Sequence, residues 1–361
     1  MAGLLNFFNS ISGGSYLGVD IGTTSIKLAE VEQGESGPRL LNYGFLETQS
    51  ALLRANTALQ TSTLKLFDKE TVEFLKALIA QVKPRSRNVV ASLPPFSAFT
   101  TIISLPEMEQ KELEQAIVYQ ARQYIPLPIS EVALDWSKVG ETEDEKGKKH
   151  LQILLISVPQ EQIKKYQRIF IEAGLTLKAL ELESLALMRS VIGNDPTPTL
   201  LLDIGSLSTG IMVVDGGQLK FSGQTDFSSS SLTQAVATSL NLNPLRAEEL
   251  KIEKGIAGTG ANYELSTIML PILDAIISEV RKVEFVYKTQ FPVAKPIERM
   301  ILSGGGASLL GIEKYFEKQL GIPVVKATPL SRFEYPQILE PLTGELNSAL
   351  AVSLGLGLKN L

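Results

Sequence analysis

Residues 16–32 read YLGVDIGTTSIKLAEVE, and this stretch decides the fold. An apolar run reaches the acid Asp20, turns at Gly22 through hydroxylated residues, and continues as a second apolar run. This pattern predicts two strands joined by a tight turn. A buried carboxylate without a partner is costly, so Asp20 needs either a partner in the fold or a function.

The same phrase returns at residues 198–223, which read PTLLLDIGSLSTGIMVVDGGQLKFSG. In both places an apolar strand reaches Asp-Ile-Gly, turns through hydroxylated residues, and re-enters a strand. A repeat nearly half a chain away predicts two similar domains that face each other. Later, residues 299–324 read as a strand, three glycines and a helix, with Gly321 as the helix C-cap.

Between the two phrases the hydrophobic pattern predicts a meander and then an inserted module. The strands of the meander fall at residues 15–22, 25–32 and 39–48, followed by a helix at 68–82 and a strand at 88–94. The module begins near residue 96 and has a strand, a helix, a proline-rich turn, two strands and a second helix. Its predicted elements include a strand at 98–106 and helices at 107–125 and 160–174.

Composition narrows the class of protein. The 361 residues are 44% hydrophobic and 20% charged, which is enough for about two domains with a sizeable core. The net charge of -5 argues against a dedicated nucleic-acid binder, and the lack of cysteine excludes disulfides and thiolate metal sites. His150 is the single histidine and is expected to be a loop residue. The N-terminus lacks a secretory signal pattern, so we expect a cytoplasmic protein.

The most apolar helix pattern, residues 266–287, is interrupted by acidic and basic residues. It therefore predicts a core helix, not a membrane span.

The glycine turns suggest a binding chemistry. A hairpin tip with small side chains exposes consecutive backbone N–H groups, which cradle anionic oxygens such as those of phosphate. Thr23 and Thr24 add hydroxyl donors, Lys27 on the returning strand reaches toward a terminal phosphate, and Asp20 suits a hydrated magnesium ion. Asp203 and Gly205 repeat the device in the second hairpin. The alternative is that each turn is an ordinary tight turn.

These three motifs resemble the actin-like ATPase superfamily. The resemblance implies ATP and Mg²⁺ as ligands, two phosphate loops, and an adenosine motif in LSGGGASLLGI at residues 302–312. LELESLALM resembles the first connecting helix, with Glu183 as a water-orienting acid and Ser184 where bacterial actins commonly have proline. Glu248 and Lys251 match a segment that faces the ribose; the alternative is a solvated ion pair on a helix. The residues expected to hold nucleotide are Gly22, Thr23, Thr24, Lys27, Gly205, Ser206, Glu248, Lys251, Gly304, Gly305 and Gly306, and those expected to hold the metal, through water, are Asp20 and Asp203.

The inserted module closely resembles that of the PilM family of type IV pilus assembly proteins, above all in ARQYIPLPISEVALDW at residues 121–136. The resemblance implies an α/β, actin-like ATPase fold: two ribonuclease H-like domains around a nucleotide cleft, with an inserted FtsA-like 1C subdomain. The implied bounds are an N-terminal segment (1–15), domain 1A (16–95), the 1C subdomain (96–178), a connection back into 1A (179–197), domain 2 (198–345, with 2B inserted at about 245–298) and a C-terminal helix returning to 1A (346–361).

By the same resemblance the chain is an ATP-binding adaptor with at most slow ATPase activity. Its implied partner is the N-terminal cytoplasmic tail of a PilN-like single-span protein, which holds it at the inner face of the cytoplasmic membrane. Other pilus platform proteins and motor ATPases are further possible partners, and nucleic acid is not. An FtsA-like division adaptor and a small-molecule kinase are the alternatives.

The helix at 107–125 has apolar Leu113, Ile117 and Ala121 on one face, which predicts that this face is buried in the module. The proline-set corner after it either packs on the helix or borders a groove for the partner peptide. We expect that groove between the first domain and the module, beside Ile125 and Leu127.

Overall fold

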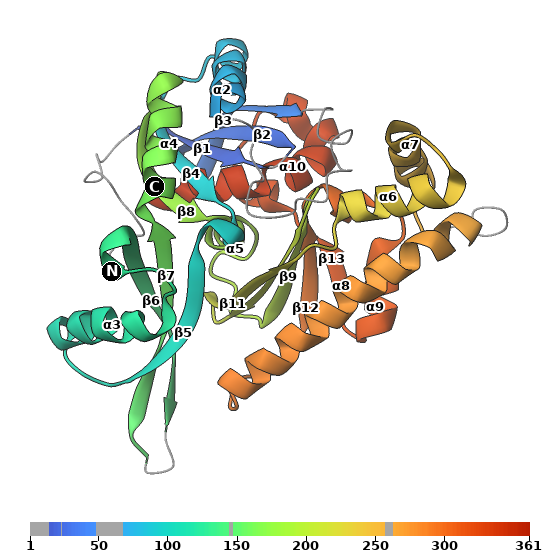
Figure 1. Ribbon diagram of the computed structural model, residues 1–361. Helices are drawn as coiled ribbons and strands as arrows, with labels where there is room; N and C mark the ends of the chain where they lie inside the picture. The colour runs from blue at the N-terminus through green and yellow to red at the C-terminus, as the bar shows by residue number, and fades with distance from the viewer. Residues whose placement is uncertain (1–13, 23, 48–67, 144–146, 257–262) are drawn as a thin grey trace.

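The computed structural model describes residues 14–22, 24–47, 68–143, 147–256 and 263–361. These residues form two five-stranded sheets and one three-stranded sheet, with helices packed around them (Figure 1). Thr23 and residues 1–13, which include most of the expected N-terminal segment, lie outside the described residues.

The first sheet has the strand order β3-β2-β1-β4-β8. Its strands are β1 (Tyr16–Ile21), β2 (Ser25–Gln33), β3 (Pro38–Glu47), β4 (Asn88–Leu93) and β8 (Thr176–Leu182). The first three strands form the predicted antiparallel meander, and β4 and β8 are added in parallel. In this register Asp20 on β1 lies opposite Lys27 on β2.

The second sheet repeats the plan, with the order β11-β10-β9-β12-β13. Its strands are β9 (Thr199–Ile204), β10 (Thr209–Asp215), β11 (Gln218–Thr225), β12 (Arg299–Ser303) and β13 (Val324–Lys326). Again three antiparallel strands are followed by two parallel ones. The two sequence phrases therefore open two sheets of the same topology, as the repeat predicts.

The third sheet, of order β5-β7-β6, carries its own small core. Its elements are β5 (Phe99–Pro106), α3 (Gln110–Tyr124), β6 (Val132–Glu143) and β7 (Lys149–Pro159), with short 3₁₀ turns η1 (Pro95–Ser97) and η2 (Ile129–Glu131) at its borders. The predicted face of α3 is buried, through Leu113, Ile117 and Ala121. Ile125 is also buried in this core, whereas Leu127 is exposed. Only Leu127 of the two corner residues is therefore available to a partner.

The other α-helices in the described part of the chain are α2 (Asp68–Val82), α4 (Gln160–Glu172), α5 (Glu183–Val191), α6 (Ser229–Leu240), α7 (Pro244–Lys254), α8 (Tyr263–Gln290), α9 (Ile312–Leu320) and α10 (Thr343–Gly357). They pack around the two large sheets, except that α6 packs on α8 and α7 packs on α6. Gly321 caps α9 in the left-handed conformation, as predicted. In the described part of the chain, no helix combines the length and apolar character needed to span a bilayer, α8 included.

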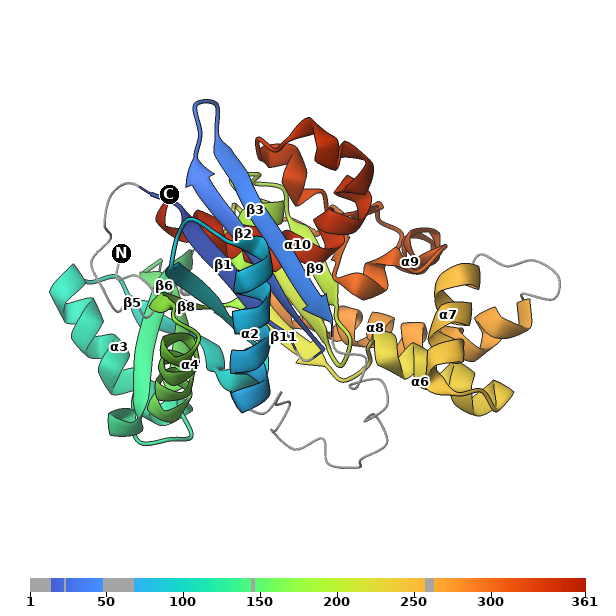
Figure 2. The ribbon, with the colours of Figure 1, turned by 90° about the horizontal axis from the view of Figure 1, so that it is seen from above.

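The sequence analysis placed α4 within the inserted module, and α4 packs both on β7 of the third sheet and on β8 and α2 of the first domain. Its buried side chains, Tyr166 and Phe170 among them, belong to the large core, which also includes Leu154, Ile156 and Val158 of β7. Figure 2 shows α4 beside α2 on one side of the first sheet, with α10 on the other side. The apolar face of an amphipathic helix fits either neighbour, so the pattern does not select one. The predicted end of the module at residue 178 therefore stays a prediction.

Glycines let α10 lie very close to the first sheet and to α5. A Cβ on Gly18 of β1 would lie 1.8 Å from the carbonyl oxygen of Ser353, and one on Gly355 would lie 1.8 Å from that of Ala186. Real Cβ atoms cannot approach so closely. The last helix is thus fixed between β1 and α5, beside the cleft that separates the two large sheets.

Candidate functional site

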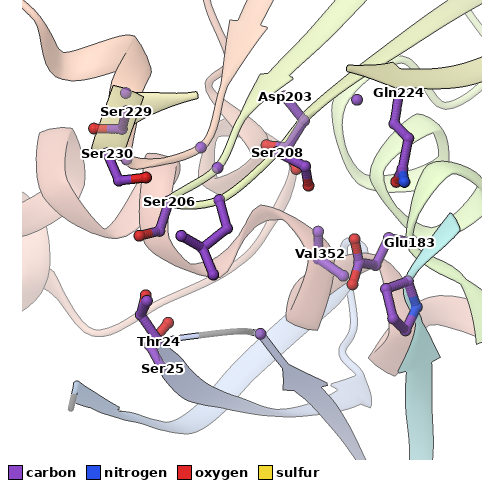
Figure 3. Close-up of a pocket in the computed structure, with 18 of the residues that line it drawn as sticks. Thr24, Ser25, Glu183, Asp203, Ser206, Ser208, Gln224, Ser229, Ser230 and Val352 are labelled. Atoms are coloured by element: carbon purple, nitrogen blue, oxygen red, sulfur yellow. The ribbon is translucent and has the colours of Figure 1, made fainter. Parts of the chain in front are cut away.

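A cleft of about 1860 Å³ lies between the two large sheets, and both Asp-Ile-Gly turns line it. The triple glycine, the start of α6 and one side of α10 also line it. Figure 3 shows Thr24 and Ser25 of the first turn on the opposite side of the cleft from Ser206 of the second. The cleft exceeds the usual range of small-molecule sites, about 300–1,000 Å³, so it has room for an extended ligand.

The first turn holds Asp20 in a buried, partnered position. The N–H of Gly22 donates to the carbonyl oxygen of Ser25 at 2.9 Å, which closes the turn. Ser92 Oγ donates to Asp20 Oδ1 at 2.8 Å, and Lys27 Nζ lies 3.7 Å from Asp20 Oδ2. The buried acid therefore has a neutral donor and a cation beside it. The Lys27 side chain remains one-quarter exposed, and its distance from Asp20 is longer than that of a hydrogen bond.

The second turn copies this geometry, since the N–H of Gly205 donates to the carbonyl oxygen of Ser208 at 2.9 Å. Burial raises the pKa of the Asp203 carboxyl; Lys27 opposes the rise, and Asp20 adds to it. Glu183, the first residue of α5, has its pKa raised by burial and then by Asp20 and Asp203. Three carboxyl groups from different elements thus concentrate negative charge in one part of the cleft.

The three consecutive glycines after β12, residues 304–306, differ in what surrounds them. Gly304 has a φ of 79°, and a Cβ there would lie 2.5 Å from the carbonyl oxygen of Ile204. A Cβ on Gly306 would lie 2.3 Å from the Ile204 side chain, whereas one on Gly305 meets no atom within 4 Å. Gly304 and Gly306 therefore let the turn after β12 lie on β9, and Gly305 leaves open space toward the cleft.

A run of serines at the start of α6 also lines the cleft, and the sequence analysis did not select it. The N–H groups of Ser229 and Ser230 donate to the carbonyl oxygens of Gly205 and Ser206, both at 3.0 Å. Ser228 caps the helix, in a reciprocal arrangement with the side chain of Ser231. These bonds attach α6 to the second turn. The sequence does contain a signal for this helix start, because four consecutive serines after a strand favour a helix N-terminus.

Glu248 and Lys251 form an ion pair at 2.8 Å, but the pair is not solvated. The Lys251 side chain is only 5% exposed. Its Nζ donates to Ser229 Oγ at 2.7 Å, to the Ser229 carbonyl oxygen at 3.2 Å and to Thr233 Oγ1 at 3.0 Å. Burial lowers the pKa of Lys251, while Glu248 raises it. The alternative of a solvated surface pair is therefore wrong: Lys251 connects α7 to the start of α6.

The structure thus brings the described site residues of the prediction to one cleft, from both large domains. Glu183 of α5 and Val352 of α10 both line the cleft (Figure 3). The neighbouring Ser184 Oγ is buried and has no hydrogen-bond partner within the described part of the chain. Among the described residues, no group of three or more histidine, aspartate or glutamate side chains is arranged to hold a metal ion directly.

Comparison with known proteins gives consistent matches. A family model described as type IV pilus assembly protein PilM matches residues 18–361. The solved PilM-PilN type IV pilus biogenesis complex is similar at 25% identity and a TM-score of 0.77, over 96% of this chain and 98% of that one. MreB5 of Spiroplasma citri, solved with AMPPNP, shares the fold at 12% identity and a TM-score of 0.54, over 95% of each chain. The predicted actin-like fold is confirmed.

Among curated relatives, cell division protein FtsA of Enterococcus hirae is 23% identical over 348 residues, which are 88% of this chain and 78% of that protein.

Proposed function

Because this chain belongs to the PilM family of type IV pilus assembly proteins, we propose that it is a nucleotide-binding adaptor of the pilus machinery. Its partner is the N-terminal cytoplasmic tail of a PilN-like single-span membrane protein, which holds the chain at the inner face of the membrane. The observation that carries this proposal is the likeness, over nearly the whole of both chains, to the PilM-PilN complex.

The ligand of the cleft is a nucleoside triphosphate, ATP in this proposal. The backbone N–H groups and hydroxyls of the two turns contact its phosphates from opposite sides, and Lys27 contacts a terminal phosphate. Gly305, with open space before it, lies beside the base. Glu248, which lines the cleft and pairs with Lys251, faces the ribose in this proposal.

Mg²⁺ fits the donor set of this site. Asp20 and Asp203 come from opposite sheets. Burial raises the pKa of Asp203 and the charge of Asp20 adds to the rise, and a cation would offset both effects. Since the described residues hold no direct metal cluster, the ion keeps most of its waters and contacts these carboxylates through them. When bound, Mg²⁺ neutralises the phosphate charge between the two domains.

Glu183 is the candidate for orienting a water molecule toward the terminal phosphate. Its raised pKa reflects burial beside two other carboxyl groups, and a bound cation would favour its charged form. Turnover is at most slow in this proposal, and the nucleotide serves mainly to hold the two large domains in one arrangement.

The tail binds beside the corner that follows α3. Gln160, at the start of α4, donates to the carbonyl oxygen of Ser130 at 3.2 Å, so the corner lies at the junction of the inserted module with the first domain. Tyr124 and Leu127 are 46% and 40% exposed there. A short apolar tail that enters a preformed groove needs little ordering, which makes useful affinity possible for a few residues.

Fluorescence anisotropy with a labelled synthetic tail peptide tests the adaptor function. We expect the intact chain to bind the peptide, and Leu127→Glu to weaken binding at least tenfold. Ile338→Glu is the matched control, because Ile338 is 83% exposed and lies outside the inserted module. No binding at high micromolar peptide would contradict the adaptor function. If Leu127→Glu binds the peptide as tightly as the wild type does, the groove lies elsewhere on the protein.

A further inference from the structure

Lys220 of β11 joins the second domain to the inserted module. Its Nζ donates a hydrogen bond to the carbonyl oxygen of Val139 on β6, and a second one to Gln218 Oε1 at 3.1 Å. The ammonium also lies 5.3 Å from the centre of the Phe291 ring, within cation–π range. Lys220 is only 7% exposed, so this charge is held away from water by its contacts.

The module is shaped to make this contact. The pairing of β6 with β7 shifts between Lys138 and Gly140, which is a bulge at Val139. A Cβ on Gly140 would lie 3.2 Å from Phe291 Cε1 and 3.5 Å from Lys220 Nζ. A bulge that presents the carbonyl, followed by a residue without a side chain, lets the edge of the module lie directly on the second domain.

Lys220 and Phe291 are the two residues of the second domain in this contact. Each is connected to the cleft through the element that contains it or lies next to it. The strand β11 continues from Lys220 to Gln224, which lines the cleft and is labelled in Figure 3. The helix α8 packs on β10 and β11 and places Ile272 in the cleft wall and Tyr287 against Phe291, with ring centres 5.6 Å apart. Lys220 and Gln224 are four residues apart on one strand, about 13 Å at 3.3 Å per residue, so one short strand segment separates the contact from the cleft.

On the module side, β6 runs from the contact to the proposed tail groove. Its first residue, Val132, is buried in the module core together with Ile125 of the corner. Lys220 and the corner are thus connected by one strand.

We propose that the contact of Lys220 and Phe291 with the bulge at Val139 couples the cleft to the inserted module, so that nucleotide binding changes the affinity for the partner tail. This inference rests on the proposed function and specifies its regulation. Because the coupling is a free energy shared by two sites, it acts equally in both directions.

Hydrogen exchange with the full chain tests the coupling without the tail. The amide exchange of residues 132–143 is measured with and without Mg²⁺ and a non-hydrolysable ATP analogue, in wild type, Lys220→Met and Gly140→Val. Lys138→Met is the matched control, since Lys138 lies beside the bulge but is 47% exposed. We expect nucleotide to change exchange in β6 of wild type and Lys138→Met, and not of Lys220→Met.

Gly140→Val acts on the contact from the opposite side by inserting a side chain against Phe291, so it tests the inference even if Lys220→Met does not fold. It too should lose the β6 response while the cleft segments keep theirs. An unchanged β6 response in a folded Lys220→Met or Gly140→Val variant would overturn the coupling. If the cleft of wild type responds but β6 does not, the coupling is wrong and nucleotide binding stands. If neither responds, nucleotide binding itself is wrong.

The tail peptide gives the second readout. We expect Mg²⁺ and nucleotide to change the peptide affinity of wild type at least fivefold, within the usual range of coupling between sites. In Lys220→Met the ratio should fall to near one while each ligand alone still binds. A ratio that remains at the wild-type value would also overturn the inference.

Discussion

Gly22 and Gly205 occupy equivalent positions, because the N–H of each donates a 2.9 Å hydrogen bond to the carbonyl oxygen of the serine three residues later. The two turns come from different sheets of the same topology and face each other across one cleft. A ligand that contacts both turns therefore holds the two domains together. The predictions below test that arrangement one residue at a time.

Removal of the Lys27 ammonium should weaken Mg-ATP binding. A hydrogen bond between charged groups contributes about 1.5–3 kcal/mol, so Lys27→Ala should raise the dissociation constant about 10- to 150-fold. Calorimetric titration checks this, with Lys314→Ala as the control, because Lys314 is exposed on α9. An affinity equal to that of wild type would remove Lys27 from the phosphate site.

Glu183→Gln should keep nucleotide affinity within about twofold and reduce turnover at least tenfold. A residue that orients water acts mainly in the transition state, so its loss affects the rate and not the binding. Binding calorimetry and phosphate release under single-turnover conditions separate the two effects. Equal losses of affinity and rate would instead identify Glu183 as a structural residue.

Gly304 and Gly305 should respond differently to the same substitution. Gly304→Ala places a Cβ against the Ile204 carbonyl oxygen at a φ of 79°, so it should lower the free energy of unfolding by at least about 2 kcal/mol. Gly305→Ala meets open space and should leave stability unchanged within about 0.5 kcal/mol, yet it should weaken nucleotide binding. Urea unfolding and calorimetry of both variants decide. If Gly305→Ala binds normally, the base does not lie beside this turn.

Protonation of Glu181 should account for part of the stability that the protein loses at low pH. Its buried carboxylate accepts two hydrogen bonds from Arg189, at 2.6 and 2.7 Å, and one from Lys359 at 3.0 Å. Burial alone would raise the pKa of this carboxyl, but Arg189 and Lys359 hold it below the usual value. A depressed folded-state pKa adds stability above the unfolded pKa of about 4.3, and that stability is lost as the pH falls through the folded pKa.

Glu181→Gln should therefore lower the free energy of unfolding by about 3–5 kcal/mol at pH 7, the usual cost of breaking a buried pair. The difference from wild type should shrink as the pH falls below about 4. Urea titrations across this range measure it. A difference that is the same at pH 7 and pH 3 would show that the carboxylate charge is not what matters.

The sequence predicted the parts of this protein that follow from local pattern. The meander, the repeated Asp-Ile-Gly hairpins and the helix at 68–82 were all predicted within a residue or two, since alternation and helical period determine them directly. The residues of the two turns were predicted because the same order of glycine and hydroxylated side chains occurs twice, each time between two apolar strands.

Contacts between distant segments could not be predicted in the same way. The spacing of Glu248 and Lys251 indicates an ion pair, but nothing in it reveals Ser229, which lies 22 residues earlier and removes Lys251 from water. The pattern of α4 fixes which of its faces is apolar and not which core that face joins. The contact of Lys220 with Val139 depends on a bulge and on the placement of a whole module, neither of which has a local signal.

The central claim is that one magnesium nucleotide is held by both domains at once, and titration of Mg-ATP into Asp20→Asn and Asp203→Asn tests it most directly. These variants keep the shape of the side chains and remove one carboxylate charge from each turn. The account predicts that wild type binds one Mg-ATP per chain, that each variant weakens binding at least tenfold, and that the loss nearly disappears when Mg²⁺ is replaced by EDTA. Wild-type affinity in either variant would contradict the claim.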